Sequence, residues 1–169
     1  MVQVSIIASR SINGVIGLNG SIPWSIPRDI ARVKALTAGK TVIMGRKTWD
    51  SLPLKPLTDR LNIVLTKNYF SKIKDAEISH DLDRIIKNVH ADDVFIIGGA
   101  EIYAQAMPYA NKMYLTEVLT FSDGDTYFPS FDHNEWVEVS RQEITGTPCF
   151  IFRELHRNND KPALAVSVR

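Results

Sequence analysis

One carboxylate in this chain occupies a position that suggests chemistry. Asp29 follows two prolines and a tryptophan in the segment SIPWSIPRDI, at the start of an apolar helical pattern. At the helical period, Val33 lies one turn beyond Asp29 and Leu36 two turns beyond it, and Ile30 flanks them. Arg28 and Arg32 fall on the far side. The helix therefore directs Asp29 toward its apolar face.

Two interpretations of Asp29 stay open on these residues alone. An acidic side chain in a first helical turn satisfies free backbone N–H groups and suits the helix dipole. Alternatively, Asp29 lines a pocket and faces a cationic or amide-rich ligand. Because a buried carboxylate without partners is costly, this second interpretation requires a partner elsewhere.

Three predicted strands end in residues that suit phosphate groups. TVIMG runs into Arg46, Lys47 and Thr48, LNIVLT runs into Lys67, and VFII runs into a Gly-Gly pair. In open α/β sheets, ligands bind beyond the carboxyl ends of the strands, where turns and helix starts offer N–H groups. Each signal is weak alone, but three at one sheet edge predict a ligand with several phosphates.

Other kinds of site are not indicated. Neither G-x-G-x-x-G nor G-x-x-x-x-G-K-[ST] occurs, and the four histidines lack metal-ligand spacing. The formal charge of +1 implies no general attraction to nucleic acid or anionic membranes, and no apolar run approaches a membrane span. The single cysteine, Cys149, is predicted to be buried, and the lack of an internal disulfide fits a reducing cytoplasm.

The elements that must position these residues alternate along the chain. Strands are predicted for QVSIIAS, TVIMG, LNIVLT, AEIS, VFIIGG, KMYLTEVLT, WVEVSRQEI and CFIFREL, and helices at about 28–38, 46–52, 81–90 and 100–107. Continuous apolar runs are typical of strands buried on both faces. We therefore predict an α/β fold: a mixed, mostly parallel central sheet of about eight strands with flanking helices and C-terminal antiparallel strands.

A long loop follows the first predicted strand, and its composition suggests an active-site lid. Residues 11–27 hold three glycines and two prolines, together with the apolar side chains Val15, Ile16, Leu18, Ile22 and Trp24. So many apolar residues suit a plain surface loop poorly. Long loops inside compact domains are often functional, and this one is predicted to cover the site.

Taken together, these segments resemble the dihydrofolate reductase family. The resemblance is carried by GVIGLNGSIPWSIPRDI, TVIMGRKTWDSLP, IIGGAEIY, YLT and GDTYFP, in the family's order. It covers roughly residues 2–158, so it implies one domain over 1–158 and a tail over 159–169. For that tail, an extra edge strand, a disordered end and an added terminal segment all stay open.

The resemblance implies an activity and a role for Asp29. It is NADPH-dependent reduction of 7,8-dihydrofolate to 5,6,7,8-tetrahydrofolate, with hydride transfer to C6 and protonation at N5, which supplies one-carbon and thymidylate metabolism. The carboxylate of Asp29 would bind the ring N–H and exocyclic amine of the pterin, as a bidentate charged pair. Thr116 would bond Asp29 and the ligand amine, and Trp24 would help to hold a water nearby. These three residues form the implied catalytic set.

The remaining roles also come from the resemblance. The implied substrate residues are Ile7, Ile22, Asp29, Val33, Ser51, Leu52, Leu57, Arg60, Ile97 and Thr116, with Arg60 on the α-carboxylate of the folate glutamate. The implied cofactor residues are Ser9, Val15, Ile16, Gly17, Leu18, Asn19, Gly20, Ser21, Gly45, Arg46, Lys47, Thr48, Thr66, Lys67, His80, Gly98, Gly99, Ala100, Glu101, Ile102, Tyr103 and Thr126, with a cis bond between Gly98 and Gly99. No metal, nucleic acid or membrane is implied; antifolate inhibitors, a monomer and a cytoplasmic location are.

Three departures from the family pattern accompany the resemblance. Val33 stands where many relatives have Phe or Leu, Glu101 stands where some have Arg, and the loop PLKPLTDR before Arg60 differs in length from that of some bacterial relatives. Two other functions were weighed: an NADPH-dependent reductase of the riboflavin pathway and a catalytically silent nucleotide- or antifolate-binding module. The segment WSIPRD with Thr116 argues against the first, and the intact Asp29 and phosphate residues argue against the second.

Overall fold

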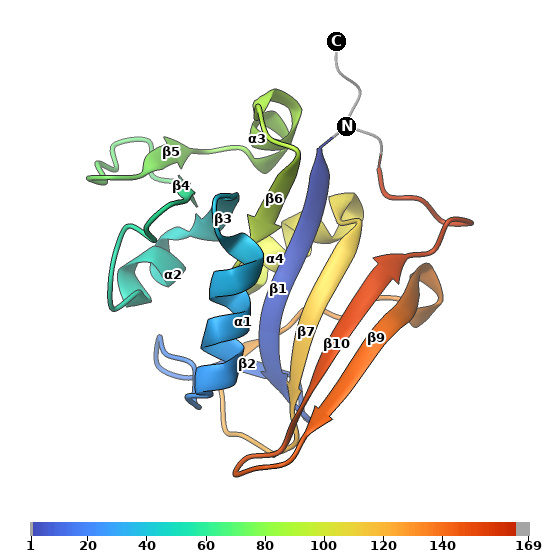
Figure 1. The fold of residues 1–169 in the computed structure, drawn as a ribbon. Helices are drawn as coiled ribbons and strands as arrows, with labels where there is room; N and C mark the ends of the chain where they lie inside the picture. Colours follow the sequence, from blue (N-terminus) through green and yellow to red (C-terminus); the bar gives the residue numbers. More distant parts are fainter. Residues whose placement is uncertain (1, 165–169) are drawn as a thin grey trace.

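The computed structural model describes residues 2–164, and its centre is an eight-stranded sheet (Figure 1). The strand order is β5-β4-β3-β6-β1-β7-β10-β9. Neighbours run parallel from β5 to β7, whereas β10 is antiparallel to both β7 and β9. The predicted mixed sheet is therefore confirmed. The strands are β1 (Gln3–Ser11), β3 (Thr41–Gly45), β4 (Leu61–Leu65), β5 (Glu77–Ser79), β6 (Asp93–Ile96), β7 (Lys112–Val118), β9 (Trp136–Ile144) and β10 (Phe150–Arg157).

Helices cover both faces of this sheet (Figure 1). The side chains of α1 and α2 pack with a cluster that includes Ile7 and Met44, and those of α3 and α4 pack with a second cluster that includes Ile6 and Ile43. Successive residues of β1 and β3 thus enter opposite clusters, which is why these strands read as continuous apolar runs. The helices are α1 (Pro27–Thr37), α2 (Arg46–Ser51), α3 (Leu82–Asn88) and α4 (Ala100–Ala106), with 3₁₀ turns η1 (Met107–Tyr109) and η2 (His133–Glu135).

The predicted lid segment contains a strand that the sequence pattern did not indicate. β2 (Val15–Gly17) pairs antiparallel with β8 (Thr126–Tyr127), and Leu18 bridges to Ser21. Val15 is fully buried, whereas Ile22 at the outer part of the segment is 60% exposed. The segment is therefore attached at one end to a distant part of the chain.

Three sequence expectations outside the site need correction. Arg32 does not point to solvent: its guanidinium lies 4.4 Å from the Phe152 ring centre and donates to the carbonyl of Arg153. Ile30, expected to flank the apolar face of α1, is 60% exposed. Cys149 is half-buried rather than buried, because it sits in the turn between β9 and β10, where its thiol donates to the carbonyl of Gly146.

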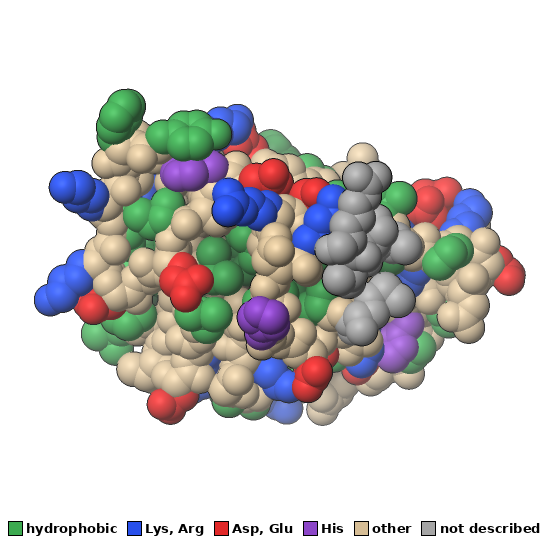
Figure 2. Space-filling view, turned by 90° about the horizontal axis from the view of Figure 1, so that it is seen from above, with side chains coloured by type: hydrophobic (Ala, Val, Ile, Leu, Met, Phe, Trp, Pro, Cys, Tyr) green, Lys and Arg blue, Asp and Glu red, His purple; other side chains and the backbone are tan. Residues whose placement is uncertain are grey.

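The described part of the tail is not a strand. Within residues 159–164, the N–H of Leu164 donates to the carbonyl of Pro108, and Lys161 lies 3.5 Å from Asp132. Residues 165–169 lie outside the described residues. Within residues 2–164, no helix has the length and hydropathy needed to cross a bilayer. On the face in Figure 2, basic and acidic side chains are interspersed, in keeping with the small net charge.

Candidate functional site

Asp29 is held by a side chain from the sheet rather than by its own helix. It lies in the first turn of α1, and its Oδ1 accepts a hydrogen bond of 2.5 Å from the hydroxyl of Thr116 on β7. Thr116 is almost fully buried. The residue before the helix, Ile26, provides no side-chain cap. The geometry thus favours the pocket interpretation of Asp29 over the capping one.

Burial decides the protonation behaviour of this carboxyl. Burial raises the pKa of Asp29, and the hydrogen bond from Thr116 and the charge of Arg32 only partly offset that effect. The described residues offer Asp29 no cation within ion-pair distance. A half-buried carboxylate with one neutral donor has room for further donors from a ligand.

The lid and the sheet are joined beside Asp29. The indole Nε1 of Trp24 donates to the hydroxyl of Ser9 at 2.7 Å. Ser9 on β1 pairs directly with Thr116 on β7, so the two residues lie on the same face of the sheet as Asp29. The structure therefore brings together the predicted catalytic residues and one predicted cofactor residue.

The predicted substrate residues line the same face. Ile7 is buried, and its carbonyl accepts from the hydroxyl of Tyr103 at 2.7 Å. Burial raises the pKa of Tyr103, which keeps this hydroxyl a donor. Ile7 belongs to the hydrophobic cluster that also includes Met44, and the half-buried side chains packed on this cluster include Val33, Leu52, Leu57 and Ile97. Ile22 is exposed at 60% and Ser51 is exposed, with its hydroxyl donating to the carbonyl of Thr48, so neither is enclosed here.

Arg60 is fixed against the C-terminal end of α1. Its Nε donates to the hydroxyl of Thr37 at 2.7 Å, its Nη2 to the carbonyl of Lys34 at 2.8 Å and its Nη1 to the carbonyl of Thr58. A guanidinium has five N–H donors. Three are used in these bonds, so two remain for a ligand carboxylate.

The turns after β3 and β6 meet beyond the C-terminal ends of these two strands. The N–H of Gly45 donates to the carbonyl of Gly98 at 2.8 Å, and the Gly98–Gly99 peptide bond is cis, as the resemblance implied. Gly98 has a φ of +133°, and a Cβ built there would lie 3.2 Å from the hydroxyl oxygen of Thr48. Glycine is therefore required at this position by conformation and by space.

The predicted cofactor residues that follow β4 contact one another and α4 at the same end of the sheet. A ring nitrogen of His80 lies 2.6 Å from the carbonyl oxygen of Thr66, and the His80 ring is 4.2 Å from that of Tyr69. Lys67, next to Thr66, is 88% exposed and lies 3.7 Å from Glu101. The implied residues Ile102 and Tyr103 are instead buried, with the side chain of Tyr103 against Gly98 and that of Ile102 against Gly45, so they support the two turns.

Two residues with clear structural roles are not among the residues predicted from the sequence. Asp125 accepts from the N–H of Asn19 at 2.9 Å, and its own N–H donates to the carbonyl of Gly17, so it fastens the lid. Arg32 reaches the sheet beside Asp29. Asp125 lies inside the quoted segment GDTYFP, which was a usable signal, whereas nothing local to Arg32 reveals its contact with β10.

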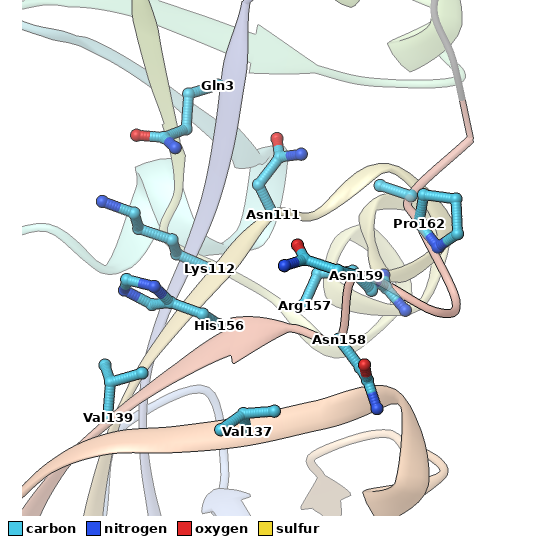
Figure 3. A pocket seen from close by; sticks show the side chains of 11 residues that line it. Gln3, Asn111, Lys112, Val137, Val139, His156, Arg157, Asn158, Asn159 and Pro162 are labelled. Atoms are coloured by element: carbon cyan, nitrogen blue, oxygen red, sulfur yellow. The ribbon is translucent and has the colours of Figure 1, made fainter.

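A separate groove of about 500 Å³ lies at the other end of the strands (Figure 3). Lys112 and His156, which are direct neighbours on β7 and β10, project into it, together with Gln3 from the start of β1. Thr116 is four residues further along β7, about 13 Å away at ~3.3 Å per residue. The groove is thus remote from Asp29. No group of three or more potential metal ligands occurs in the part of the chain that the structure describes.

Comparison with known proteins places this arrangement in a family. A family model described as dihydrofolate reductase matches residues 3–153. The dihydrofolate reductase of Neisseria meningitidis serogroup A is 43% identical over 144 residues, which cover 85% of this chain and 89% of the relative. That of Mycobacterium leprae is 40% identical over 159 residues, covering 90% and 96%.

A solved structure shows the same fold. Dihydrofolate reductase from Enterococcus faecalis, complexed with NADP(H) and RAB-propyl, has a TM-score of 0.88 and 26% identity to this chain, covering 93% of this chain and 97% of that chain. The family model spans most of the sequence, and the curated relatives exceed 40% identity at their best. The resemblance drawn from the quoted segments is therefore confirmed: the chain belongs to the dihydrofolate reductase family.

Proposed function

We propose that this chain reduces 7,8-dihydrofolate to 5,6,7,8-tetrahydrofolate with NADPH, by hydride transfer to C6 and protonation at N5. The observation that carries the proposal is the half-buried carboxylate of Asp29, whose one hydrogen-bond partner among the described residues is Thr116 and which is short of further donors. The pterin ring offers such donors as a fork, its ring N–H beside its exocyclic amine. A carboxylate bound to this fork fixes the orientation of the ring as well as adding binding energy.

Each residue near Asp29 has a role in this proposal. Asp29 in its charged form favours a proton at N5, which makes C6 a better hydride acceptor, and the proton arrives through water. Thr116 holds Asp29 in place and bonds the ligand amine. Trp24, tied to Ser9, helps to hold that water beside the carboxylate. The carbonyls of Ile7 and Ile97 would meet the amine, and the two free N–H groups of Arg60 would bind the glutamate α-carboxylate.

The residues beyond the C-terminal ends of β3, β4 and β6 fit NADPH. When bound, NADPH supplies the hydride. The backbone of the Gly98–Gly99 turn lies beside Thr48, where a pyrophosphate would lie, and Arg46 and Lys67 follow neighbouring strands, where a 2′-phosphate would lie. The lid over 12–26, anchored through Asp125, would close over the nicotinamide and exclude water. Antifolates would occupy the pterin site, and the enzyme would act as a monomer in the cytoplasm.

A single assay tests the activity against the two other functions. The purified chain is mixed with NADPH and 7,8-dihydrofolate, and absorbance is followed at 340 nm. We expect a loss of absorbance that requires dihydrofolate and that falls strongly in the Asp29→Asn variant. Oxidation of NADPH with a ribosylated pyrimidine but not with dihydrofolate would instead indicate the riboflavin-pathway reaction, and binding without turnover would indicate a silent module.

A further inference from the structure

The two cations assigned to the 2′-phosphate are each paired with a carboxylate of the chain, but in different ways. Arg46 uses only its Nε, which lies 3.0 and 3.1 Å from the two carboxylate oxygens of Asp50, one turn further along α2. Lys67 follows β4, and its ammonium lies 3.7 Å from the carboxylate of Glu101 on α4. The first pair stays within one helix, whereas the second spans two elements.

These geometries leave the cations in different states. A guanidinium has five N–H groups in a fixed fork, so the Arg46–Asp50 pair orients the side chain and leaves its terminal nitrogens available. An ammonium is a compact point charge, and the carboxylate of Glu101 is its ion-pair partner at 3.7 Å. Both members of this second pair are highly exposed, at 88% for Lys67 and 77% for Glu101, so the pair opens easily.

We propose that Glu101 is a specificity-determining residue that competes with the cofactor's 2′-phosphate for Lys67, whereas Asp50 is a positioning residue for Arg46. This inference rests on the proposed function. A phosphate monoester carries more negative charge than a carboxylate, so it displaces Glu101 from Lys67, but the displaced carboxylate stays nearby. Glu101 therefore weakens the binding of NADPH, and it does so more than for NADH, which lacks the 2′-phosphate.

The test is a set of dissociation constants for NADPH and NADH, measured by quenching of protein fluorescence in wild type and in Glu101→Gln, Lys67→Gln and the double variant. Since exposed ion pairs of this kind have modest coupling, we expect Glu101→Gln to bind NADPH about two- to fivefold more tightly and NADH unchanged. In the Lys67→Gln background, the gain should vanish. It should also shrink at high salt, because the groups are exposed.

Two further variants separate the roles of the carboxylates. Asp50→Asn should weaken NADPH binding, because Arg46 loses its orientation, and should never tighten it. Asp83→Asn is the matched control: it frees Lys87 from a similar exposed pair of 2.6 Å on α3, outside the proposed site. It should leave both dissociation constants unchanged.

Several results would overturn the inference. An equal gain for NADH, or a gain that persists without Lys67, would mean that Glu101 repels the cofactor in general rather than competing for one cation. If wild type reduces dihydrofolate with NADPH and Glu101→Gln leaves the affinity unchanged, the inference alone is wrong. If wild type binds no NADPH, the proposed function is wrong and the inference falls with it.

Discussion

At the scale of single residues, Asp29 lies where burial disfavours its charged form. Because burial raises its pKa, the folded state holds this proton more tightly than the unfolded state does, whose pKa is about 3.9. Stability contributed by this group therefore falls as pH rises from about 4 through the raised pKa. The carboxylate is thus retained at a cost in stability.

Replacing Asp29 with Asn should separate stability from activity. The amide oxygen still accepts from Thr116, but the buried charge is gone, so the free energy of unfolding of Asp29→Asn should exceed that of wild type at pH 7 and converge with it near pH 4. Denaturant unfolding at both pH values measures this. A variant that is less stable at pH 7 would restore the capping interpretation.

The same variant should lose most of its turnover. Removing a group that favours protonation of the reacting atom costs about 10²- to 10⁴-fold in rate at neutral pH. The loss should become smaller at low pH, where solution protonates the substrate. Steady-state kinetics from pH 5 to 8 provide the check, and an unchanged kcat would show that Asp29 has no part in the reaction.

Val33 is expected to influence inhibitors more than substrate. It is half-buried one turn beyond Asp29, where a larger ring would cover more of a bound ligand. If Val33→Phe buries roughly 40–60 Å² more, the gain is about 1–1.5 kcal/mol, or about tenfold in affinity. The gain should be larger for a rigid diaminopyrimidine than for dihydrofolate. The inhibition constant measured beside KM decides, and an unchanged or weaker inhibitor would indicate overpacking.

The proposed 2′-phosphate cations should determine cofactor preference. Removing the charge of Arg46 or Lys67 by substitution with Gln should lower kcat/KM for NADPH and leave that for NADH nearly unchanged, because only NADPH carries the phosphate. A single exposed charge–phosphate contact suggests a loss of about fivefold or more. Wild type with equal kcat/KM for both cofactors would refute the assignment of these residues.

At the scale of elements, the lid depends on a close contact that only glycine allows. A Cβ at Gly124 would lie 2.2 Å from Cγ1 of Val15 and 2.9 Å from the carbonyl of Gly17. Because Val15 is fully buried, it cannot move aside without displacing β2. Gly124→Ala should therefore cost about 1–3 kcal/mol and reduce kcat.

Gly146→Ala is a matched control for that variant. A Cβ at Gly146 in the β9–β10 turn would meet only the carbonyl of Pro148 at 3.5 Å, an ordinary contact. Thermal unfolding and kcat of the two variants should therefore differ clearly. Equal behaviour of the two would mean that the lid tolerates displacement.

The elements that sequence could predict are those set by local pattern. β1, β3, β4 and β6 read as apolar runs because both of their faces are buried, and α1 followed from prolines and a periodic face. β2 and β8 were not predicted, because each has only two or three residues and lies within a segment rich in glycine and other turn residues, SINGVIGLNG and SDGDTYFP. The stability of each comes from a partner far along the chain, as with the bond from Asn19 to Asp125, 106 residues apart.

In the candidate site too, residues set by local pattern could be predicted, whereas those set by distant contacts could not. Asp29 and the Gly98–Gly99 turn could be identified from residue type and spacing, because they lie at the start of a helix and the end of a strand. Thr116 required the family resemblance, since only folding places β7 beside α1. The location of Arg32 over Phe152 could not be predicted, because it depends on β10, which joins the sheet from the other end of the sequence.

At the scale of the whole molecule, the candidate site and the groove lie at opposite ends of the strands. The ends of the strands beside Asp29 hold the candidate site, whereas the opposite end holds the groove with Lys112 and the described part of the tail. Near the tail, Arg157 lies 4.2 Å from the Trp136 ring and 3.0 Å from Glu135. The end of β10 is therefore held in the domain by these contacts before the tail begins.

Removing residues 159–169 should leave the enzyme intact. Among the described residues, the deletion takes away two local hydrogen bonds to Asn158, from Asp160 and Lys161. It also removes two contacts with more distant parts of the chain: the exposed Lys161–Asp132 pair and the hydrogen bond from Leu164 to Pro108, while Arg157 keeps its partners. Distant contacts of this kind contribute about 0–1 kcal/mol each, so the loss of two should lower Tm by at most about 4–8 °C for a chain of this size. Because the described part of the tail and Asp29 lie at opposite ends of the sheet, kcat should not change. Thermal unfolding and turnover of a chain ending at Asn158 test this, and a lost activity or a much larger fall in Tm would make the tail part of the domain.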